Sequence, residues 1–346
     1  MKIVNNIRRL ILFVSLSIVS LVLIFLFTAS RKTVQALGDV THSYLLFVVG
    51  LCIVEFVIEG VRLVFFVRGT GERIRLLEAL KLASIAIFFN LITPFSFGGQ
   101  PLLVYILRKE GIPSGKGSTI VITRLLTASL FIFMGAIFAL VFFGHLISSV
   151  AALRTTFFIT GILFIFLAGL TVTGLLLPRM MTAVARRLGR LLHHLHLVKD
   201  EELFLTKSIQ HLYIARNSFQ AYFGHRFGYL VGGTLCSGVI YFSQVLMLWA
   251  ILCGLGVPIG FIEGFALSAL FLFLIVFAPT PGSSGLGEII FVIIFAGTVP
   301  KYLLGVAILL WRFFYQYLVA FLGGIVTAKY FSDLLVKDPK EIEKRL

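Results

Sequence analysis

The sequence predicts an all-α polytopic membrane protein with about six full spans and two re-entrant helical hairpins, arranged as an inverted-topology repeat. Three observations support this prediction: apolar stretches long enough to cross a bilayer, two proline- and glycine-rich interruptions with matching spacing, and basic residues concentrated in alternate loops. Hydrophobic residues make up 59% of the 346 positions and the mean hydropathy is +1.05, whereas soluble domains are about 45–50% apolar. We therefore expect residues 1-346 to form a single integral membrane domain.

A helix needs about 20 apolar residues to cross the hydrocarbon core of a membrane. Six stretches come close to or exceed this length, and we expect the first to be retained rather than removed as a signal peptide. In chain order the six predicted spans are Leu10–Thr28, Tyr44–Val67, Ser118–Phe143, Thr156–Leu177, Phe227–Cys253 and Tyr302–Ala328.

Two further pairs of apolar arms are interrupted by proline and glycine, which weaken a helix. Leu82–Ile92 and Phe95–Leu107 are too short to cross separately, so they fit a hairpin that enters and leaves the membrane on one side. Phe261–Ala278 and Leu286–Gly297 form the second pair, whose first arm is long enough for a full crossing as well. Because irregular backbone in a membrane must be buried in protein or line a wet cavity, both breaks are candidate substrate sites.

The two interruptions are spaced as an internal repeat, and chance matching of glycines and prolines is the competing explanation. We expect the first repeat to occupy 1-143 and the second 156-330. An offset of 187 places Thr93-Pro94 on Thr280-Pro281, Gly98 on Gly285 and Ile112-Pro113 on Val299-Pro300, and an offset one larger places Arg124 on Arg312.

Charge predicts the orientation of the spans. Loops assigned to the cytoplasm hold 23 lysines and arginines, and those assigned to the outside hold 4, which favours cytoplasmic termini in the cell membrane. Residues 179-226 form the largest basic stretch and are expected to include a basic amphipathic helix on the inner leaflet. With the formal net charge of +15 distributed in this way, anionic lipid headgroups are expected partners and nucleic acid is not.

No cofactor or metal ion is expected. The three cysteines fall within apolar segments, where they are typical small core residues. His193, His194 and His196 have no cysteine or carboxylate at ligand spacing beside them, so a solvated basic face is the preferred interpretation.

Arg124 and Arg312 are the leading candidates for substrate binding because they occupy matching positions in the two repeats, and a guanidinium binds phosphate through two parallel hydrogen bonds. After each break, the free N–H groups of the second half-helix are expected to point toward the ligand. Glycines could allow close approach of a headgroup or, alternatively, close helix packing. The remaining predicted site residues are Asn90, Thr93, Gly98, Gly99, Gln100, Thr280, Gly282, Ser283, Ser284 and Gly285.

Charged residues inside predicted spans are costly and need partners or a task. Glu55, Glu59 and Arg62 share one face of the second span, and Glu59 can pair with Arg62 one turn later. Such a pair could simply lock helices together, or Glu55 or Glu59 could contact a cationic group or carry a coupling proton. Glu288 is expected to be either the counter-ion of Arg312 or a proton carrier.

At the two interruptions, the sequence resembles the flippase-like family that includes the transmembrane region of lysylphosphatidylglycerol synthases, the bacterial multiple peptide resistance factors. The resemblance implies a membrane domain that moves aminoacylated or otherwise modified lipids between leaflets, with other members tied to polyprenyl-linked glycans. Only the short stretch 329-346 follows Ala328, so no synthase activity is expected and a lysyl-lipid substrate stays open. The resemblance rests on Thr93-Pro94, Gly98-Gly99-Gln100-Pro101, Gly111, Arg124, Pro279-Thr280-Pro281-Gly282, Gly285 and Glu288.

These observations predict a transporter rather than an enzyme: a flippase for a phosphate-containing lipid that is anionic, aminoacylated or polyprenyl-linked. No P-loop motif is present, so we expect facilitated or ion-coupled movement. Three alternatives stay open: an ion-coupled small-molecule transporter, a membrane enzyme acting on lipid-linked headgroups, and an accessory subunit that recruits a separate transferase.

Overall fold

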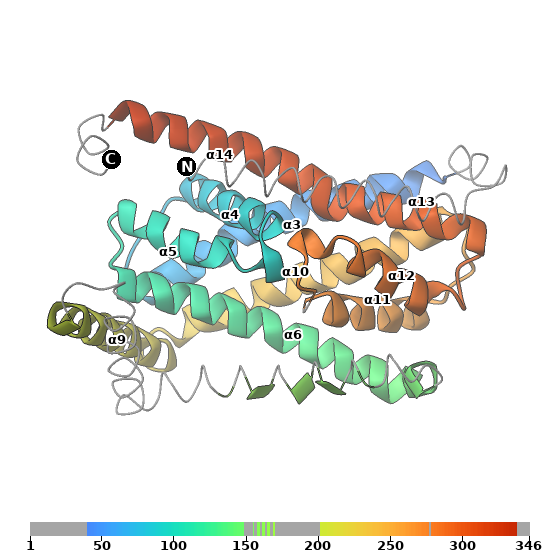
Figure 1. Ribbon diagram of the computed structural model, residues 1–346, viewed down its shortest axis with the longest axis horizontal. Coiled ribbons are helices and arrows are strands. Elements are labelled where there is room, and N and C mark those ends of the chain that lie inside the picture. Colours follow the sequence, from blue (N-terminus) through green and yellow to red (C-terminus); the bar gives the residue numbers. More distant parts are fainter. Residues whose placement is uncertain are drawn as a thin grey trace.

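The computed structural model describes residues 40–148, 201–276 and 278–337, together with scattered helical positions between 155 and 169. Within these residues, every regular element is a helix, and Figure 1 shows most of the helices packed along the long axis of the molecule. The predicted span Leu10–Thr28, most of Thr156–Leu177 and the basic stretch 179–200 lie outside the described residues.

Four helical stretches in the described part of the chain are long and apolar enough to cross a membrane. They confirm four of the six predicted spans, and their starts match the predictions to within four residues. The chain is thus a multi-pass membrane protein. The stretches are α3 (His42–Gly69), α6 (Ser114–Ser148), α10 (Phe227–Gly254) and a continuous run of α13 (Lys301–Arg312), the π turn η3 (Phe313–Tyr317) and α14 (Leu318–Lys337).

The two interrupted regions each fold as a helix, a break and a second helix. The first hairpin consists of α4 (Leu76–Leu91), η1 (Pro94–Ser96) and α5 (Gly99–Lys109). The second consists of α11 (Phe261–Ile275), η2 (Pro281–Ser283) and α12 (Leu286–Phe295). At 1.5 Å per residue, α11 is about 22 Å long, which is short of the ~30 Å hydrocarbon core. The hairpins extend from opposite ends of the bundle, and η1 contacts η2 (Figure 1).

The helix boundaries recur at nearly constant spacing. Subtracting the first residues of equivalent elements gives 187 for η1 and η2, for α5 and α12, and for α6 and α13, and gives 185 for α3 and α10. Phe95 and Ser96 have a left-handed backbone conformation, which recurs 187 residues later at Gly282 and Ser283. The start of α3 meets the end of α10: the amide of Thr41, before α3, donates to the carbonyl of Gly254, at the end of α10, over 3.0 Å.

Two hydrophobic cores hold the bundle together, one around each hairpin. The core of the first hairpin combines α4 and α5 with the end of α3 and the start of α6. The core of the second combines α11 and α12 with α13 and the second half of α10. Helices outside each hairpin also pack on the other one, because α6 packs on α11 while α14 packs on α4.

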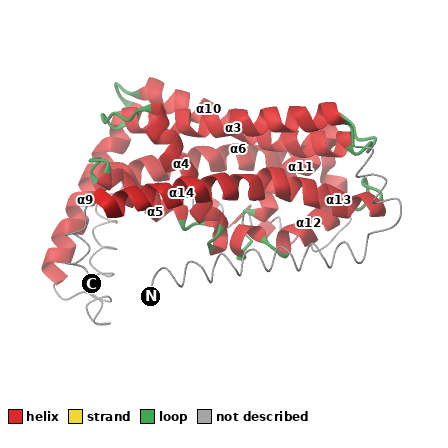
Figure 2. Cartoon of the chain, turned by 90° about the horizontal axis from the view of Figure 1, so that it is seen from above, coloured by secondary structure: helices red, strands yellow, loops and turns green. Residues whose placement is uncertain are grey.

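Helix α9 (Glu201–Phe223) crosses one end of the bundle at a steep angle (Figure 2). Tyr222 anchors it: the phenol is buried and donates a 2.6 Å hydrogen bond to the carbonyl of Phe66 on α3. Burial raises the pKa of the Tyr222 phenol above its usual value, so the group stays a neutral donor. This contact fixes α9 against the end of the bundle from which the first hairpin enters.

Candidate functional site

The break of the first hairpin is closed by its own side chains. Thr93 Oγ1 donates to the Phe89 carbonyl over 2.7 Å and accepts the amide of Gly98 over 2.9 Å. Asn90 Oδ1 accepts the amide of Gly99 over 2.9 Å. We expected the N–H groups at the start of α5 to be free for a ligand, and for these two amides that expectation is wrong. An unpaired buried amide costs about 1–3 kcal/mol, and the local side chains remove this cost.

The glycines of the first hairpin serve close packing. A Cβ atom at Gly99 would lie 1.9 Å from the carbonyl oxygen of Ala86, so only glycine allows α5 to approach α4 this closely. A Cβ atom at Gly98 would lie 2.4 Å from the Thr93 side chain. These contacts favour the packing interpretation at both positions, and close approach of a headgroup to them stays a prediction.

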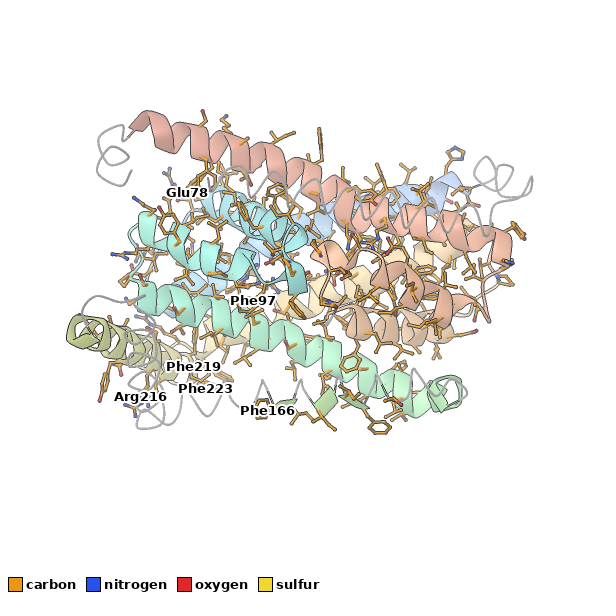
Figure 3. The ribbon with its side chains drawn as sticks, viewed as in Figure 1. Glu78, Phe97, Phe166, Arg216, Phe219 and Phe223 are labelled. Carbon is orange, nitrogen blue, oxygen red and sulfur yellow. The ribbon has the colours of Figure 1, made fainter. Side chains whose placement is uncertain are left out.

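The tip of the first hairpin is strained and open. Phe95 and Ser96 have positive φ angles of 56° and 51°, which costs a residue with a side chain of order 1–3 kcal/mol. Phe95 and Phe97 are each 59% exposed, and Figure 3 shows Phe97 near the middle of the bundle's length, between α5 and α6. The hairpin therefore presents aromatic side chains outward, far from both ends of the bundle.

The tip of the second hairpin is buried instead. Pro281, Gly282, Ser283 and Ser284 are all buried, and Ser283 Oγ donates to the carbonyl of Ile275 over 3.1 Å. Gly282 has a positive φ of 53°. Glycine adopts this conformation without the strain energy that it costs Phe95, which has a side chain. The second break is thus built into the protein interior, whereas its equivalent is not.

Arg312 organises this second break. Its side chain is fully buried, as is that of Glu288, and the two form an ion pair of 2.6 Å. The guanidinium also donates to the carbonyls of Gly282 over 2.6 Å and Ser283 over 3.0 Å, and to the side chain of Gln316. Of the two predicted roles of Glu288, the geometry favours that of counter-ion. Both terminal nitrogens of Arg312 are engaged by protein groups and not by an open site.

The π turn η3 supplies the last member of this network. Gln316 lies one turn after Arg312, and its Nε2 donates to the Gly282 carbonyl over 2.8 Å. π turns are rare and often occur at functional sites. We did not predict Gln316, although its spacing of four residues from Arg312 within an apolar span was a usable signal.

Arg124 has different partners. It forms a 2.7 Å ion pair with Glu59, which also pairs with Arg62 over 2.6 Å, so the predicted contact between Glu59 and Arg62 is confirmed. All three side chains are at most 10% exposed. Ser237 on α10 completes the group: it accepts from Arg62 over 3.4 Å and shares a 2.9 Å hydrogen bond with Thr127. We call Glu59, Arg62 and Arg124 the Glu59 cluster; these three carry one more positive than negative charge.

Glu55 lies one turn before Glu59 on α3 and has its own partner. Its carboxylate accepts a 2.7 Å hydrogen bond from Nε2 of Gln244 on α10. The sequence favours packing over ligand binding for Gln244, and in the structure its partner is Glu55, a protein group. Whether Glu55 is ionised thus decides the local charge balance: an ionised Glu55 offsets the excess positive charge of the Glu59 cluster, and a protonated one leaves it in place.

Two further predicted site residues lie beside the contact between the breaks. Gln100 follows η1 and Thr280 precedes η2, and each is partly exposed. Their atoms Gln100 Oε1 and Thr280 Oγ1 are buried and have no hydrogen-bond partner among the described residues. These two oxygens are therefore available to a ligand where the hairpins meet.

Similarity to known proteins extends over most of the chain. The family described as "Lysylphosphatidylglycerol synthase TM region" matches residues 11–323. A UPF0104 membrane protein from Archaeoglobus fulgidus is 23% identical over 332 residues, which cover 89% of this chain and 93% of the relative. No solved structure matches the chain significantly. The match over most of the chain means that this protein belongs to the lysylphosphatidylglycerol synthase transmembrane-region family.

Proposed function

We propose that this protein is a flippase that moves a phosphate-containing lipid between the leaflets of the cell membrane by alternating access. The observation that carries the proposal is the meeting of two broken hairpins that extend from opposite ends of the bundle. In a membrane, these elements would be re-entrant and would form an inverted-topology repeat, with the breaks near the midplane. Transporters of this architecture bind substrate at such breaks.

Lateral exposure of the first break supports a lipid over a soluble substrate. Phe95 and Phe97 are both 59% exposed and lie far from the ends of the bundle, where a soluble solute would enter. Aromatic side chains at this depth contact acyl chains at little cost. The substrate class is therefore a lipid with a phosphate, whether an anionic or aminoacylated phospholipid or a polyprenyl-linked lipid.

The two matching arginines have separate roles in this proposal. Arg312 holds the second break together, and protein groups engage both of its terminal nitrogens. Arg124 belongs to the Glu59 cluster, which has an excess positive charge and therefore attracts a phosphate. Proton uptake by Glu55 would increase that attraction, which gives the cycle a point of ion coupling. We propose that the protein moves the lipid without converting it chemically, and that a separate transferase carries out any modification of the lipid.

The test is lipid exchange in liposomes that contain short-chain fluorescent anionic, zwitterionic and cationic phospholipids, with dithionite quenching to count the lipid in each leaflet. Arg124→Gln removes a charge-assisted contact worth about 1.5–3 kcal/mol, so exchange should slow roughly 10–100-fold. Lys301→Gln is the control, because Lys301 is an exposed cation outside the cluster. Wild-type exchange no faster than in protein-free liposomes, or an Arg124→Gln variant as fast as the control, would refute the proposal.

A further inference from the structure

We propose that a groove at the α9 end of the bundle binds an anionic glycerophospholipid of the adjoining leaflet and loads it toward the first hairpin. The groove has a volume of about 690 Å³ and lies between the last turns of α3 and the start of α4. Figure 3 shows Glu78, at its margin, at the same end of the molecule as α9. Its walls include Val61, Val64, Phe65, Arg68, Arg73 and Arg75.

The charge of the groove suits a phosphate. Arg68, Arg73 and Arg75 are all exposed, and Arg75 is paired with Glu78 over 2.9 Å. Among the described residues, neither Arg68 nor Arg73 has a carboxylate partner. Glu72, which lies between them in the chain, is bound by Lys116 over 2.6 Å and so does not neutralise them.

The apolar wall suits an acyl chain. Val61, Val64 and Arg68 lie at helical spacing on one face of α3, and the exposed residues Val54 and Val57 continue that face toward the middle of the bundle. At 1.5 Å per residue, Val57 lies about 16 Å from Arg68 along the helix axis. One leaflet of the hydrocarbon core is about 15 Å thick. A chain lying along this face would place its phosphate at Arg68 and Arg73.

This combination of exposed arginines and an apolar stripe is the reason for naming a lipid and not a free anion. A soluble phosphate would use the arginines but gain nothing from the valine stripe, whereas a phospholipid uses both. The loading role rests on the proposed flippase function, because α4 runs directly from the groove to the first break. The binding itself does not depend on transport.

Native mass spectrometry of the full-length protein in neutral detergent, titrated with phosphatidylglycerol, tests the binding. A basic side chain at a membrane surface contributes about 1 kcal/mol, or roughly fivefold, so Arg68→Gln/Arg73→Gln should bind about 25-fold more weakly. The matched control is Lys301→Gln/Lys329→Gln, which removes two exposed lysines outside the groove and should stay within about twofold of wild type. Equal affinity of the two double variants would overturn the proposal.

Two further measurements fix the occupant and its role. Inorganic phosphate and phosphatidylcholine should displace bound labelled phosphatidylglycerol at least tenfold less effectively than unlabelled phosphatidylglycerol does. Equally effective displacement by inorganic phosphate would mean a free-anion site and overturn the assignment to a lipid. In liposomes, the arginine double variant should need more phosphatidylglycerol for half-maximal exchange and keep the maximal rate. An unchanged half-maximal fraction would overturn the loading role. If wild type exchanges no lipid, the flippase proposal fails while the titration still decides the groove.

Discussion

Replacing Arg312 with methionine should destabilise the second hairpin strongly. Methionine keeps much of the apolar stem of arginine, so the substitution removes the charge and the hydrogen bonds without opening a large cavity. What remains is the carboxylate of Glu288, fully buried and without the guanidinium that lies 2.6 Å away. The carbonyl of Ser283 also loses its 3.0 Å donor, whereas that of Gly282 retains Gln316.

The expected loss follows from the burial of the pair. Removing one member of a buried ion pair costs about 3–5 kcal/mol, because the other member is left as an uncompensated charge. Glu288→Gln should cost less, since Arg312 would keep its two carbonyl acceptors and Gln316. The double variant Arg312→Met/Glu288→Gln leaves neither charge of this pair buried at the second break and should recover part of the loss.

Thermal unfolding in detergent measures this series through the three free cysteines, which are buried or half-buried and react with a maleimide dye when the protein opens. Arg312→Met should lower the midpoint by about 5 °C or more, given a few degrees per kcal/mol for chains of this size. The double variant should melt above Arg312→Met. If Arg312→Met has the same unfolding midpoint as wild type, or the double variant has a lower midpoint than Arg312→Met, the ion pair does not hold the break together.

Two other substitutions test packing with the same melt. Gly99→Ala should cost about 1–3 kcal/mol of stability or prevent folding, because its Cβ would lie 1.9 Å from a backbone oxygen. The control is Gly50→Ala, which has open space around it and should be neutral or gain up to about 1 kcal/mol. Equal unfolding midpoints of the two variants would count against the hairpin packing. Tyr222→Phe should cost about 1 kcal/mol by removing the bond to the Phe66 carbonyl and speed limited proteolysis of α9; unchanged cleavage would show that this bond does not anchor the helix.

The elements of the fold were predictable because their signals are local. Span lengths follow from hydropathy, and the breaks follow from proline, which cannot donate its backbone nitrogen. The same local signals predict the equal spacing of the two breaks, because Pro94 and Pro281 begin η1 and η2. The prediction left one point open, whether Phe261–Ala278 crosses fully, and α11 ends at Ile275, before the length needed.

The partners of the buried charges were less predictable because they come from tertiary packing. Arg124 and Arg312 match in the repeat, which suggested one shared role. Their counter-ions do not match: Glu59 lies on a spanning helix, and Glu288 lies on a hairpin arm. With the offset of 185 between α3 and α10, the position equivalent to Glu59 is Gln244, an uncharged residue. Repeat matching thus locates equivalent backbone but does not assign equivalent chemistry.

This asymmetry between the two breaks bears on the alternating access that we propose. The second break is tied to α13 and η3 by an ion pair and hydrogen bonds to two backbone carbonyls, so displacing it would break several buried polar contacts at once. The hydrogen bonds that Thr93 and Asn90 make at the first break run within its own hairpin and would survive movement of that hairpin as a unit. Strain at Phe95 adds energy that a second conformation could release. In a flippase cycle, the first hairpin is therefore the element expected to move, against a second hairpin that stays fixed.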